Sequence, residues 1–443
     1  MSTALITPSP LRGAAAAPPS ISELHRALIM SSLAVGETVI EGFSACGDVC
    51  RTLEGLRPLA DFTESQKKLT VRSAALSPVR GAKSQVDCFT ARVFRPRQDI
   101  YTPGAPLVVE CGDSAATMRF LVPIYAVLGL PVRFTCSQRL AGRFADPYDK
   151  VLPALGARLT KCEDGFLLLG KLRPGRYLLP ENIGSQFISG LLQALVLLVS
   201  PSVVRLSAPP ESATYLELTR YIAARFGVYY TESRSSGKAE FSVKPQNYQG
   251  CIYKVGGDWT ASSALLAAGA IAGDVHMRGL DATSAQGDRC ISPLLLSMGA
   301  RGKGGHLTAG RLQGTVFDAS HSPDLVPALA AAACFAQGVT LITGTRRPTD
   351  GGDGKQAYLA AELAGLGGDI EVLPDGLRIV GRPSLPGGRA DVASDHLVAM
   401  AAAAAASACR GSSELIGVES IKKSYPAFFE DYASLGGIAK LTD

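Results

Sequence analysis

The stretch LPALGARL, residues 152–159, has the pattern of a helix that ends at a glycine and leads directly into a strand. A glycine at that point can adopt a positive φ, which lets the chain leave the helix without strain. The same pattern recurs in AARFGVYY (223–230), LLSMGARG (295–302), LAGLGGDI (363–370) and YASLGG (432–437). Each stretch therefore predicts the end of a helix in a repeated unit.

The five glycines of this pattern are evenly spaced. They stand at positions 156, 227, 299, 367 and 436, so the intervals are 71, 72, 68 and 69 residues. Such a repeat is longer than solenoid repeats, which span about 20–50 residues. We infer repeated αβ units, each with helices packed on a mixed sheet. The predicted fold class is α/β.

Apolar runs and short β-rich runs fill these units. Apolar runs of helical length predict core helices at 118–130, 187–199, 261–272, 325–335 and 397–408. Runs rich in branched and aromatic residues predict strands at 132–135, 166–169, 177–180, 203–206, 241–244, 339–344 and 377–380. The polar, turn-rich segment 233–251 predicts a hinge between two halves.

Length and composition limit the class of protein. A chain of 443 residues is long enough for at least two domains, and 47% hydrophobic with 19% charged residues indicates a globular protein. The net charge of +5 is spread along the chain without a basic run, which argues against nucleic-acid and membrane-surface partners. The longest apolar stretches, 187–200 and 396–409, are too short to span a bilayer and predict buried helices.

Targeting, redox and cofactor signals are also weak. The N-terminal residues lack the pattern of a signal peptide, and the ten cysteines are scattered, with Cys46 and Cys50 the closest pair. We expect reduced cysteines and a cytoplasmic protein. Five scattered histidines predict no metal site, and no nucleotide fingerprint follows a strand. We expect neither a metal nor another cofactor.

Polar groups gather in four segments where a predicted core helix begins: 19–28, 111–119, 184–187 and 320–325. In the first, Ser20 or Ser22 is suited to cap the helix, with Arg26 about one turn inside. Each segment alone is compatible with an ordinary helix cap, and Asp324 with no more than a cap. Together they predict helix N-termini directed at a small anionic ligand.

These segments, with 139–154, 212–228, 286–300, 395–396 and 423–426, resemble the 5-enolpyruvylshikimate-3-phosphate (EPSP) synthase family from about residue 20 to 437. The resemblance implies two inside-out α/β domains, each of three βαβαββ units, that close on ligand. It implies that residues 1–20 and 250–443 form one domain. Residues 21–249 would form the other, which binds the shikimate phosphate.

Family members bind shikimate 3-phosphate beside phosphoenolpyruvate and transfer the enolpyruvyl group to the 5-hydroxyl. By resemblance, Ser22 and Arg26 match ligands of the shikimate carboxylate. The matches to phosphate ligands are Ser185, Ser212 and Tyr215.

Other matched positions lie between the two ligands or on the phosphoenolpyruvate side. Gln186 matches a glutamine between the ligands, and Asp324 an aspartate that holds the ring hydroxyls and relays protons. Arg143, His396 and Lys423 match polar positions of the phosphoenolpyruvate side. Lys355 stands where the family has an arginine.

Several positions depart from the family pattern. Ile21 stands in place of a lysine, and Leu397 stands in place of an arginine. Gly351 and Gly352 replace a Lys-Glu pair, and residues 113–117 replace a turn that begins with asparagine and contains glycine. Loss of two carboxylate ligands would cost about 3–6 kcal/mol, or about 10²- to 10⁴-fold in affinity. The resemblance therefore implies a weakened phosphoenolpyruvate site.

From these departures we expect a single anionic ligand and a lyase reaction. The predicted reaction is a 1,4-elimination of phosphate from shikimate 3-phosphate or a close relative, which yields a dihydroxycyclohexadiene carboxylate. The candidate bases are Asp324, His396 and Lys423, with Glu23 and His25 less favoured. One alternative is a divergent enolpyruvyl transferase that holds phosphoenolpyruvate with Lys355, Arg143 and Lys423. The other is a non-catalytic protein that binds shikimate phosphate.

Overall fold

The computed structural model describes residues 1–73, 104–144, 148–180, 183–207, 213–235, 238–345 and 354–442. The chain divides into two compact units, each described here by itself. Unit 1 comprises Met1–Ser20 and Gly256–Asp443, and unit 2 comprises Ile21–Val255.

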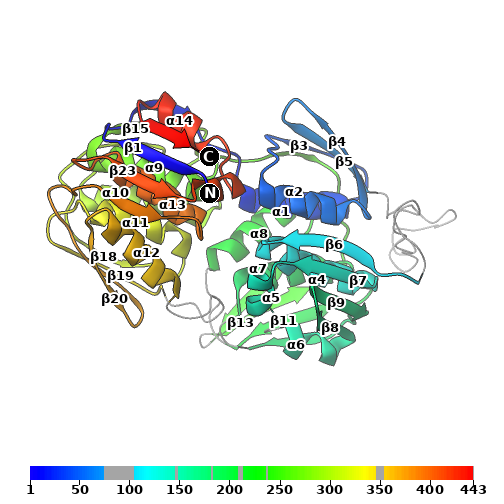
Figure 1. The fold of residues 1–443 in the computed structure, drawn as a ribbon. Coiled ribbons are helices and arrows are strands. Elements are labelled where there is room, and N and C mark those ends of the chain that lie inside the picture. Colours follow the sequence, from blue (N-terminus) through cyan, green and yellow to red (C-terminus); the bar gives the residue numbers. More distant parts are fainter. Residues whose placement is uncertain are drawn as a thin grey trace. The chain divides into compact units, whose positions relative to one another are not determined.

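Each unit contains three four-stranded sheets in the described part of the chain, and all six sheets share one topology (Figure 1). Two parallel strands at one end are followed by two antiparallel strands. A parallel pair needs a crossover connection. In four sheets an interior helix supplies it, whereas the parallel pairs 37–41 with 252–254 and 12–16 with 274–278 are separated in sequence by most of unit 2. The structure thus confirms the predicted α/β class and the βαβαββ repeat.

The strands of unit 2, in sheet order, are β14 (Ile252–Lys254), β3 (Glu37–Glu41), β5 (Lys68–Ser73), β4 (Ala60–Ser65); β6 (Leu107–Gly112), β7 (Val132–Cys136), β9 (Gly165–Gly170), β8 (Ala157–Cys162); and β10 (Arg176–Leu179), β11 (Ser202–Leu206), β13 (Lys238–Val243), β12 (Thr231–Ser235). Those of unit 1 are β16 (Arg301–Lys303), β17 (His306–Thr308), β15 (Asp274–Arg278), β2 (Arg12–Ala16); β18 (Val316–Asp318), β19 (Val339–Thr343), β21 (Gly376–Val380), β20 (Asp369–Leu373); and β22 (Arg389–Asp391), β23 (Ser413–Ile416), β1 (Thr3–Thr7), β24 (Ile438–Thr442). All seven predicted strands are among them.

The first helix of each repeat lies in the interior of its unit. These helices are α1 (Ile21–Ser32), α4 (Ala115–Leu128) and α7 (Ser185–Leu195) in unit 2, and α9 (Trp259–Ala272), α11 (Val326–Ala333) and α13 (His396–Ala406) in unit 1. In unit 1 all three pack against one another. Every residue of α13 from Val398 to Ala406 is buried, as expected for a helix that is apolar on all sides. The five predicted core helices are confirmed.

The second helix of each repeat lies nearer the surface. This set comprises α2 (Gly47–Leu56), α5 (Gln138–Phe144), α6 (Tyr148–Val151), α8 (Ala213–Arg225), α10 (Ile291–Met298), α12 (Gly354–Gly365) and α14 (Phe428–Ser434). Short 3₁₀ helices are η1 (Pro153–Leu155), η2 (Gly287–Cys290), η3 (Pro323–Leu325) and η5 (Val418–Lys423). Among the helices that the structure describes, none has the length and apolarity needed to cross a membrane.

The glycine pattern marks the end of this second helix. Gly227, Gly299, Gly367 and Gly436 follow α8, α10, α12 and α14, and Gly156 follows η1; all five have φ between +75° and +115°. The sixth copy departs from the pattern, because α2 ends at Arg57 with φ −53° and no glycine. The predicted helix ends are therefore confirmed for five repeats, and the irregular sixth explains why only five glycines appear.

The predicted hinge at 233–251 is wrong in position. Residues in this segment form β13 and part of β12, which pair as an antiparallel hairpin in unit 2. Alternation explains the polar sequence, because Ala239, Phe241 and Val243 face the interior and the residues between them do not. The division between the units falls after Val255.

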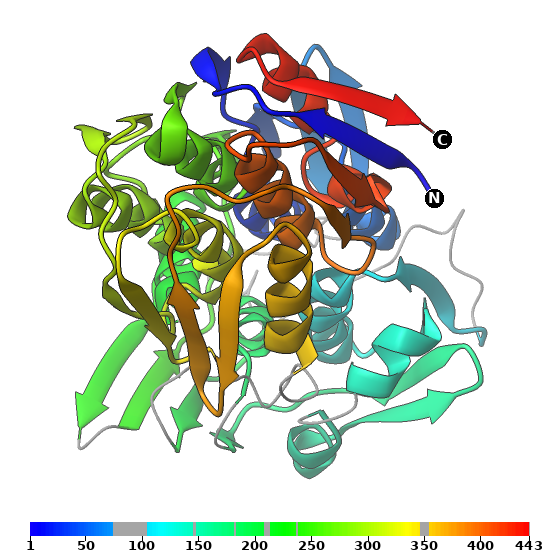
Figure 2. The same cartoon turned by 60° about the vertical axis from the view of Figure 1, so that its left-hand side comes forward.

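Both ends of the chain belong to the same sheet of unit 1. Strand β1 lies between β23 and β24 and pairs antiparallel with both, as Figure 2 shows for the blue and red strands. Strand β2 joins a second sheet, parallel to β15. The first 20 residues are therefore an integral part of unit 1.

We predict that Gly299→Ala destabilises the protein more than Gly436→Ala does. Both positions have positive φ, which costs about 1–2 kcal/mol for alanine. At Gly299 the new Cβ would also lie 2.3 Å from the Arg311 carbonyl oxygen, whereas at Gly436 nothing lies within 4 Å. We expect the loss at Gly299 to be larger by at least about 1 kcal/mol in urea unfolding. Equal losses would contradict the clash.

Candidate functional site

The four polar segments of the sequence do precede interior helices. Three of them lead into α1, α4 and α7 of unit 2, and the fourth leads through η3 into α11 of unit 1. The candidate residues therefore form two groups, one in each unit, which are described in turn.

Arg26 is the centre of the group in unit 2. Its Nε donates to Thr219 Oγ1 at 2.7 Å, and its Nη1 donates to the Ser22 carbonyl at 2.7 Å. Its Nη2 donates to the Tyr215 carbonyl at 3.2 Å and to Ser189 Oγ at 3.5 Å. One guanidinium thus joins α1 to α7 and α8, although its partners on α8 lie up to 193 residues away in sequence.

The Arg26 guanidinium is buried but keeps its charge near neutral pH. The side chain is only 2% exposed, and its Cζ lies 5.1 Å from the ring centre of Phe120 on α4. Burial lowers the pKa of Arg26 to about 10, while Tyr215, Tyr253 and Glu23 oppose that shift. A buried cation with polar partners on several helices is a centre of positive potential in this unit.

This arrangement brings together several residues that the resemblance assigns to shikimate phosphate. Ser22 and Tyr215 contact Arg26 through their backbone carbonyls, and Ser185 lies one turn before Ser189 on α7. Ser185 is buried, in the first turn of α7, where backbone N–H groups favour an anion. Their predicted ligand roles stay predictions.

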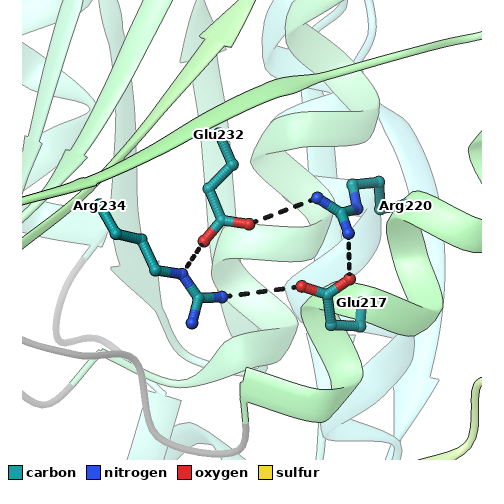
Figure 3. A network of polar contacts seen from close by, with 4 residues as sticks. All are labelled: Glu217, Arg220, Glu232 and Arg234. Atoms are coloured by element: carbon teal, nitrogen blue, oxygen red, sulfur yellow. Dashed lines mark hydrogen bonds and ion pairs between the residues drawn. The ribbon is translucent and has the colours of Figure 1, made fainter.

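An ion network holds the outer side of α8 (Figure 3). Arg220 contacts Glu217 at 2.7 Å and Glu232 at 3.5 Å, and Arg234 contacts the same two carboxylates at 3.7 and 2.5 Å. Glu217 and Arg220 lie on α8, whereas Glu232 and Arg234 lie on β12. Four alternating charges fix the helix that carries Tyr215 and Thr219 to its sheet, more firmly than an isolated surface pair would.

Arg119 on α4 is a candidate that the predicted site residues did not include. Its Nη1 donates to Oε1 of Gln186 at 2.9 Å, and its carbonyl accepts from the buried Tyr148 hydroxyl at 2.9 Å. Helices α4 and α7 approach closely at Gly190 of α7, where a Cβ would lie 2.8 Å from the Arg119 carbonyl oxygen. Its position in the polar segment 111–119, next to a helix start, was the available signal.

A chain of buried hydroxyls orders the first turn of α4. His25 Nδ1 lies 2.8 Å from Thr52 Oγ1, which lies 2.8 Å from Thr117 Oγ1, which in turn lies 2.9 Å from Ser114 Oγ. Ser114 caps α4 by accepting from the Thr117 amide. His25 thus contributes to the packing of α1, α2 and α4. Glu23, the other less favoured base, is buried and accepts from the Tyr253 hydroxyl at 2.8 Å.

The group in unit 1 lies on neighbouring elements. Asp324 is in η3, His396 begins α13 and Lys423 ends η5, and all three are half-buried. Helix α13 packs against both α11 and η5, and Ser420 Oγ of η5 donates to the Val392 carbonyl just before α13. Lys355 is exposed in the first turn of α12.

Some positions named from the sequence are outside the description. Ser212, Gly351 and Gly352 lie outside the described residues, and of Arg143 only the backbone of α5 is described. Among the described residues, no three or more His, Cys, Asp or Glu side chains form a group suited to a metal ion.

The departures Ile21 and Leu397 occupy ordinary places in their helices. Ile21 is the first residue of α1 and is half-buried. Leu397 packs against the core of unit 1, and its amide donates to Asp395 Oδ1 at 2.8 Å. The helix starts therefore form without the cationic side chains that the family pattern has there.

We predict that Thr219→Val destabilises the protein by about 1–3 kcal/mol, because the buried Arg26 Nε then lacks its acceptor. Thr219→Ser keeps the hydroxyl, and we expect it to lose less than half as much. Denaturant unfolding of both variants measures the difference. A valine variant as stable as the wild type would show that this hydrogen bond does not hold Arg26.

We predict that Asp318→Asn destabilises the protein at neutral pH and much less in acid. The Ser320 amide and hydroxyl lower the pKa of Asp318, with a smaller contribution from His321. A folded pKa below the unfolded value contributes stability above the carboxyl range, and this is lost as the pH falls through the folded pKa. The unfolding free energies of the wild type and of Asp318→Asn, measured from pH 7 downward, should therefore converge. A difference that does not change with pH would refute this.

Comparison with known proteins identifies the family. The model of the family EPSP synthase (3-phosphoshikimate 1-carboxyvinyltransferase) matches residues 5–432. The 3-phosphoshikimate 1-carboxyvinyltransferase of Clostridium perfringens ATCC 13124 is 34% identical, covering 99% of this chain and 100% of that protein. The enzyme of the same name from Clostridium acetobutylicum is 32% identical, with 99% and 98% covered. A solved EPSP synthase from Acinetobacter baumannii has the same fold, with TM-score 0.76, 20% identity and 100% coverage of both chains.

The predicted elimination of phosphate without phosphoenolpyruvate is wrong, because full-length relatives are named for carboxyvinyl transfer. The alternative of a non-catalytic binding protein has no support from them either. The error lay in reasoning from lost charges alone. A missing cation weakens the binding of an anion, but it supplies no new group for a different reaction. The chain is an enzyme of the EPSP synthase family, to which it belongs over nearly its whole length.

Proposed function

We propose that this protein transfers the carboxyvinyl group of phosphoenolpyruvate to the 5-hydroxyl of shikimate 3-phosphate and releases inorganic phosphate. The observation that carries the proposal is the 34% identity, over 99% of the chain, to a protein named 3-phosphoshikimate 1-carboxyvinyltransferase. In this reaction the oxygen of the 5-hydroxyl bonds to C2 of phosphoenolpyruvate and the hydroxyl loses its proton, while C3 gains a proton. Loss of phosphate and of a proton then restores the double bond.

We assign shikimate 3-phosphate to unit 2, residues Ile21–Val255. The ligand carries nearly three negative charges, and Arg26 supplies a buried positive charge among α1, α7 and α8. The first turn of α7 adds backbone N–H donors beside Ser185. Ser22, Tyr215 and Ser212 complete the proposed ligand set, by resemblance to the family.

Gln186 is proposed to lie next to both substrates, oriented by Arg119. The 2.9 Å bond from Arg119 Nη1 to Gln186 Oε1 fixes the amide so that its NH₂ group points away from the guanidinium. Because Arg119 is itself cationic, it adds positive charge beside the proposed anion sites.

For phosphoenolpyruvate we propose Arg143, Lys355 and Lys423 as cationic ligands, with His396 beside them. Lysine binds a carboxylate as a point charge and lacks the planar fork of arginine. Together with Ile21 and Leu397, which carry no charge, this set predicts a weaker phosphoenolpyruvate site than the family pattern gives. Asp324, on η3, is proposed to bind the ring hydroxyls and to relay the proton.

The experiment measures phosphate release with shikimate 3-phosphate alone, with phosphoenolpyruvate alone and with both. We expect release only with both substrates, together with one equivalent of enolpyruvyl product. Release from shikimate 3-phosphate alone, or none with both, would overturn the proposal.

The same assay with Leu397→Arg tests the assignment of the second ligand. An added cation at this helix start should lower KM for phosphoenolpyruvate by about 10- to 100-fold and leave KM for shikimate 3-phosphate unchanged. Val316→Arg is the matched control, because it adds the same charge elsewhere in unit 1. Val316 lies on β18 and is 71% exposed. If both variants lower KM for phosphoenolpyruvate equally, the effect comes from the net charge of the protein and the assignment of the second ligand is contradicted.

A further inference from the structure

The loop that leads into α13 is held by side chains of α12. Helix α12 packs against β22 and α13, as the gold helix of Figure 2 shows. Between β22 and α13 the chain runs from Asp391 to Asp395, and His396 is the first residue of the helix. The conformation of this short segment therefore helps to set the position of the His396 backbone.

Tyr358 of α12 binds this segment twice. Its hydroxyl donates to the Asp391 carbonyl at 2.7 Å and accepts from the Ser394 amide at 3.2 Å. A phenol has one proton to donate and a lone pair to accept with, so both bonds can form at once. Burial raises the pKa of Tyr358 to about 12, so the hydroxyl keeps its proton near neutral pH.

Glu362 completes the attachment one turn further along α12. It lies four residues after Tyr358, on the same helix face, and its Oε2 accepts from the Asp391 amide at 2.5 Å. Both backbone polar groups of Asp391 are therefore bound by α12. The Asp391 side chain in turn accepts from the Ala393 amide at 3.2 Å.

The end of the segment is fixed by the helix cap. Asp395 Oδ1 accepts from the amides of Leu397 at 2.8 Å and Val398 at 3.4 Å, so α13 starts at His396. Directly before the cap, the Ser394 amide is bound by the Tyr358 hydroxyl. A shift of Ser394 would therefore carry the cap and the His396 backbone with it.

The same face of α12 relates His396 to Lys355. Lys355 lies three residues before Tyr358, about one helical turn away. Lys355, a proposed ligand of phosphoenolpyruvate, and His396, which is proposed to lie beside it, thus stand at the starts of two helices of unit 1. Tyr358 joins α12 by hydrogen bonds to the segment that leads into α13.

We propose that Tyr358 is a positioning residue that fixes the place of His396 relative to Lys355. This inference rests on the proposed function, in which both residues serve phosphoenolpyruvate. Tyr358 does not touch substrate; it acts through the Asp391–Ser394 backbone. A displacement of about 1 Å in such a group costs about 10²-fold in rate.

The test compares Tyr358→Phe with Tyr177→Phe. The first removes only the hydroxyl that binds the segment. The second removes a hydroxyl that donates to the Arg173 carbonyl at 2.7 Å, from a buried tyrosine of unit 2. We expect Tyr358→Phe to lower kcat about 10- to 100-fold with KM for shikimate 3-phosphate unchanged, and Tyr177→Phe to change neither.

A second readout does not depend on turnover. In protein labelled at the histidine rings, the His396 signal is assigned by its loss in His396→Gln. Tyr358→Phe should shift this signal and leave those of the other four histidines in place, and Glu362→Met, which removes the acceptor of the Asp391 amide, should shift it too. Tyr177→Phe should not.

The outcomes separate this inference from the proposed function. A His396 signal and a kcat both unchanged in Tyr358→Phe would overturn the positioning role. If the wild type fails to turn over both substrates, the proposed function falls, and the His396 signal alone then decides whether Tyr358 fixes this residue. A shift in both variants would support the inference in either case.

Discussion

The buried charge of Arg26 is the constraint on which unit 2 depends. A guanidinium taken out of water is tolerated only where hydrogen-bond acceptors surround it. Here the acceptors come from α1, α7 and α8, with the Phe120 ring of α4 against the cation. These helices must therefore pack in one arrangement for the charge to be solvated. The candidate ligands Ser185 and Tyr215 lie within a turn of those acceptors, so the packing that solvates the cation also sets their positions.

Unit 1 reaches comparable order by a different route. Its interior helices α9, α11 and α13 are rich in alanine and contain no arginine, and Lys355 and His396 stand where helices start. Order at those starts comes from backbone hydrogen bonds, such as those that Tyr358 and Asp395 make. Because such bonds are indifferent to the side chain that they position, Leu397 can replace a cation and leave the helix start intact. Chemistry can diverge here without a change of fold.

The local parts of the fold could be predicted from the sequence. A glycine with positive φ after a helix is a local requirement, and so is an all-apolar helix in the interior. The repeat and the core helices could therefore be predicted from residues 118–437 alone. The predicted hinge was wrong because the alternation of polar and apolar residues in β13 resembles a polar linker when the partner strands are unknown. The fold depends on pairings such as β1 with β24, which no local pattern contains.

The candidate site was only partly accessible for the same reason. Residues at helix starts, such as Ser185 and Asp324, stand out in the sequence because polar groups precede apolar runs. Thr219 and Ser189 do not, since they matter only through contacts with Arg26 that span 193 and 163 residues. The reaction was misjudged because counting missing charges describes affinity and leaves the chemistry itself open.

The interleaved ends of the chain have a consequence for biosynthesis. Strand β1 is translated long before either of its partners, since β23 begins at Ser413 and β24 at Ile438. Strand β1 therefore has neither partner strand while residues 21–255, which form unit 2, are translated, and unit 2 can fold during this time. The sheet that contains β1 can therefore be completed only after β23 and β24 have been made, and a chain that stops before Ser413 would leave β1 without either partner strand.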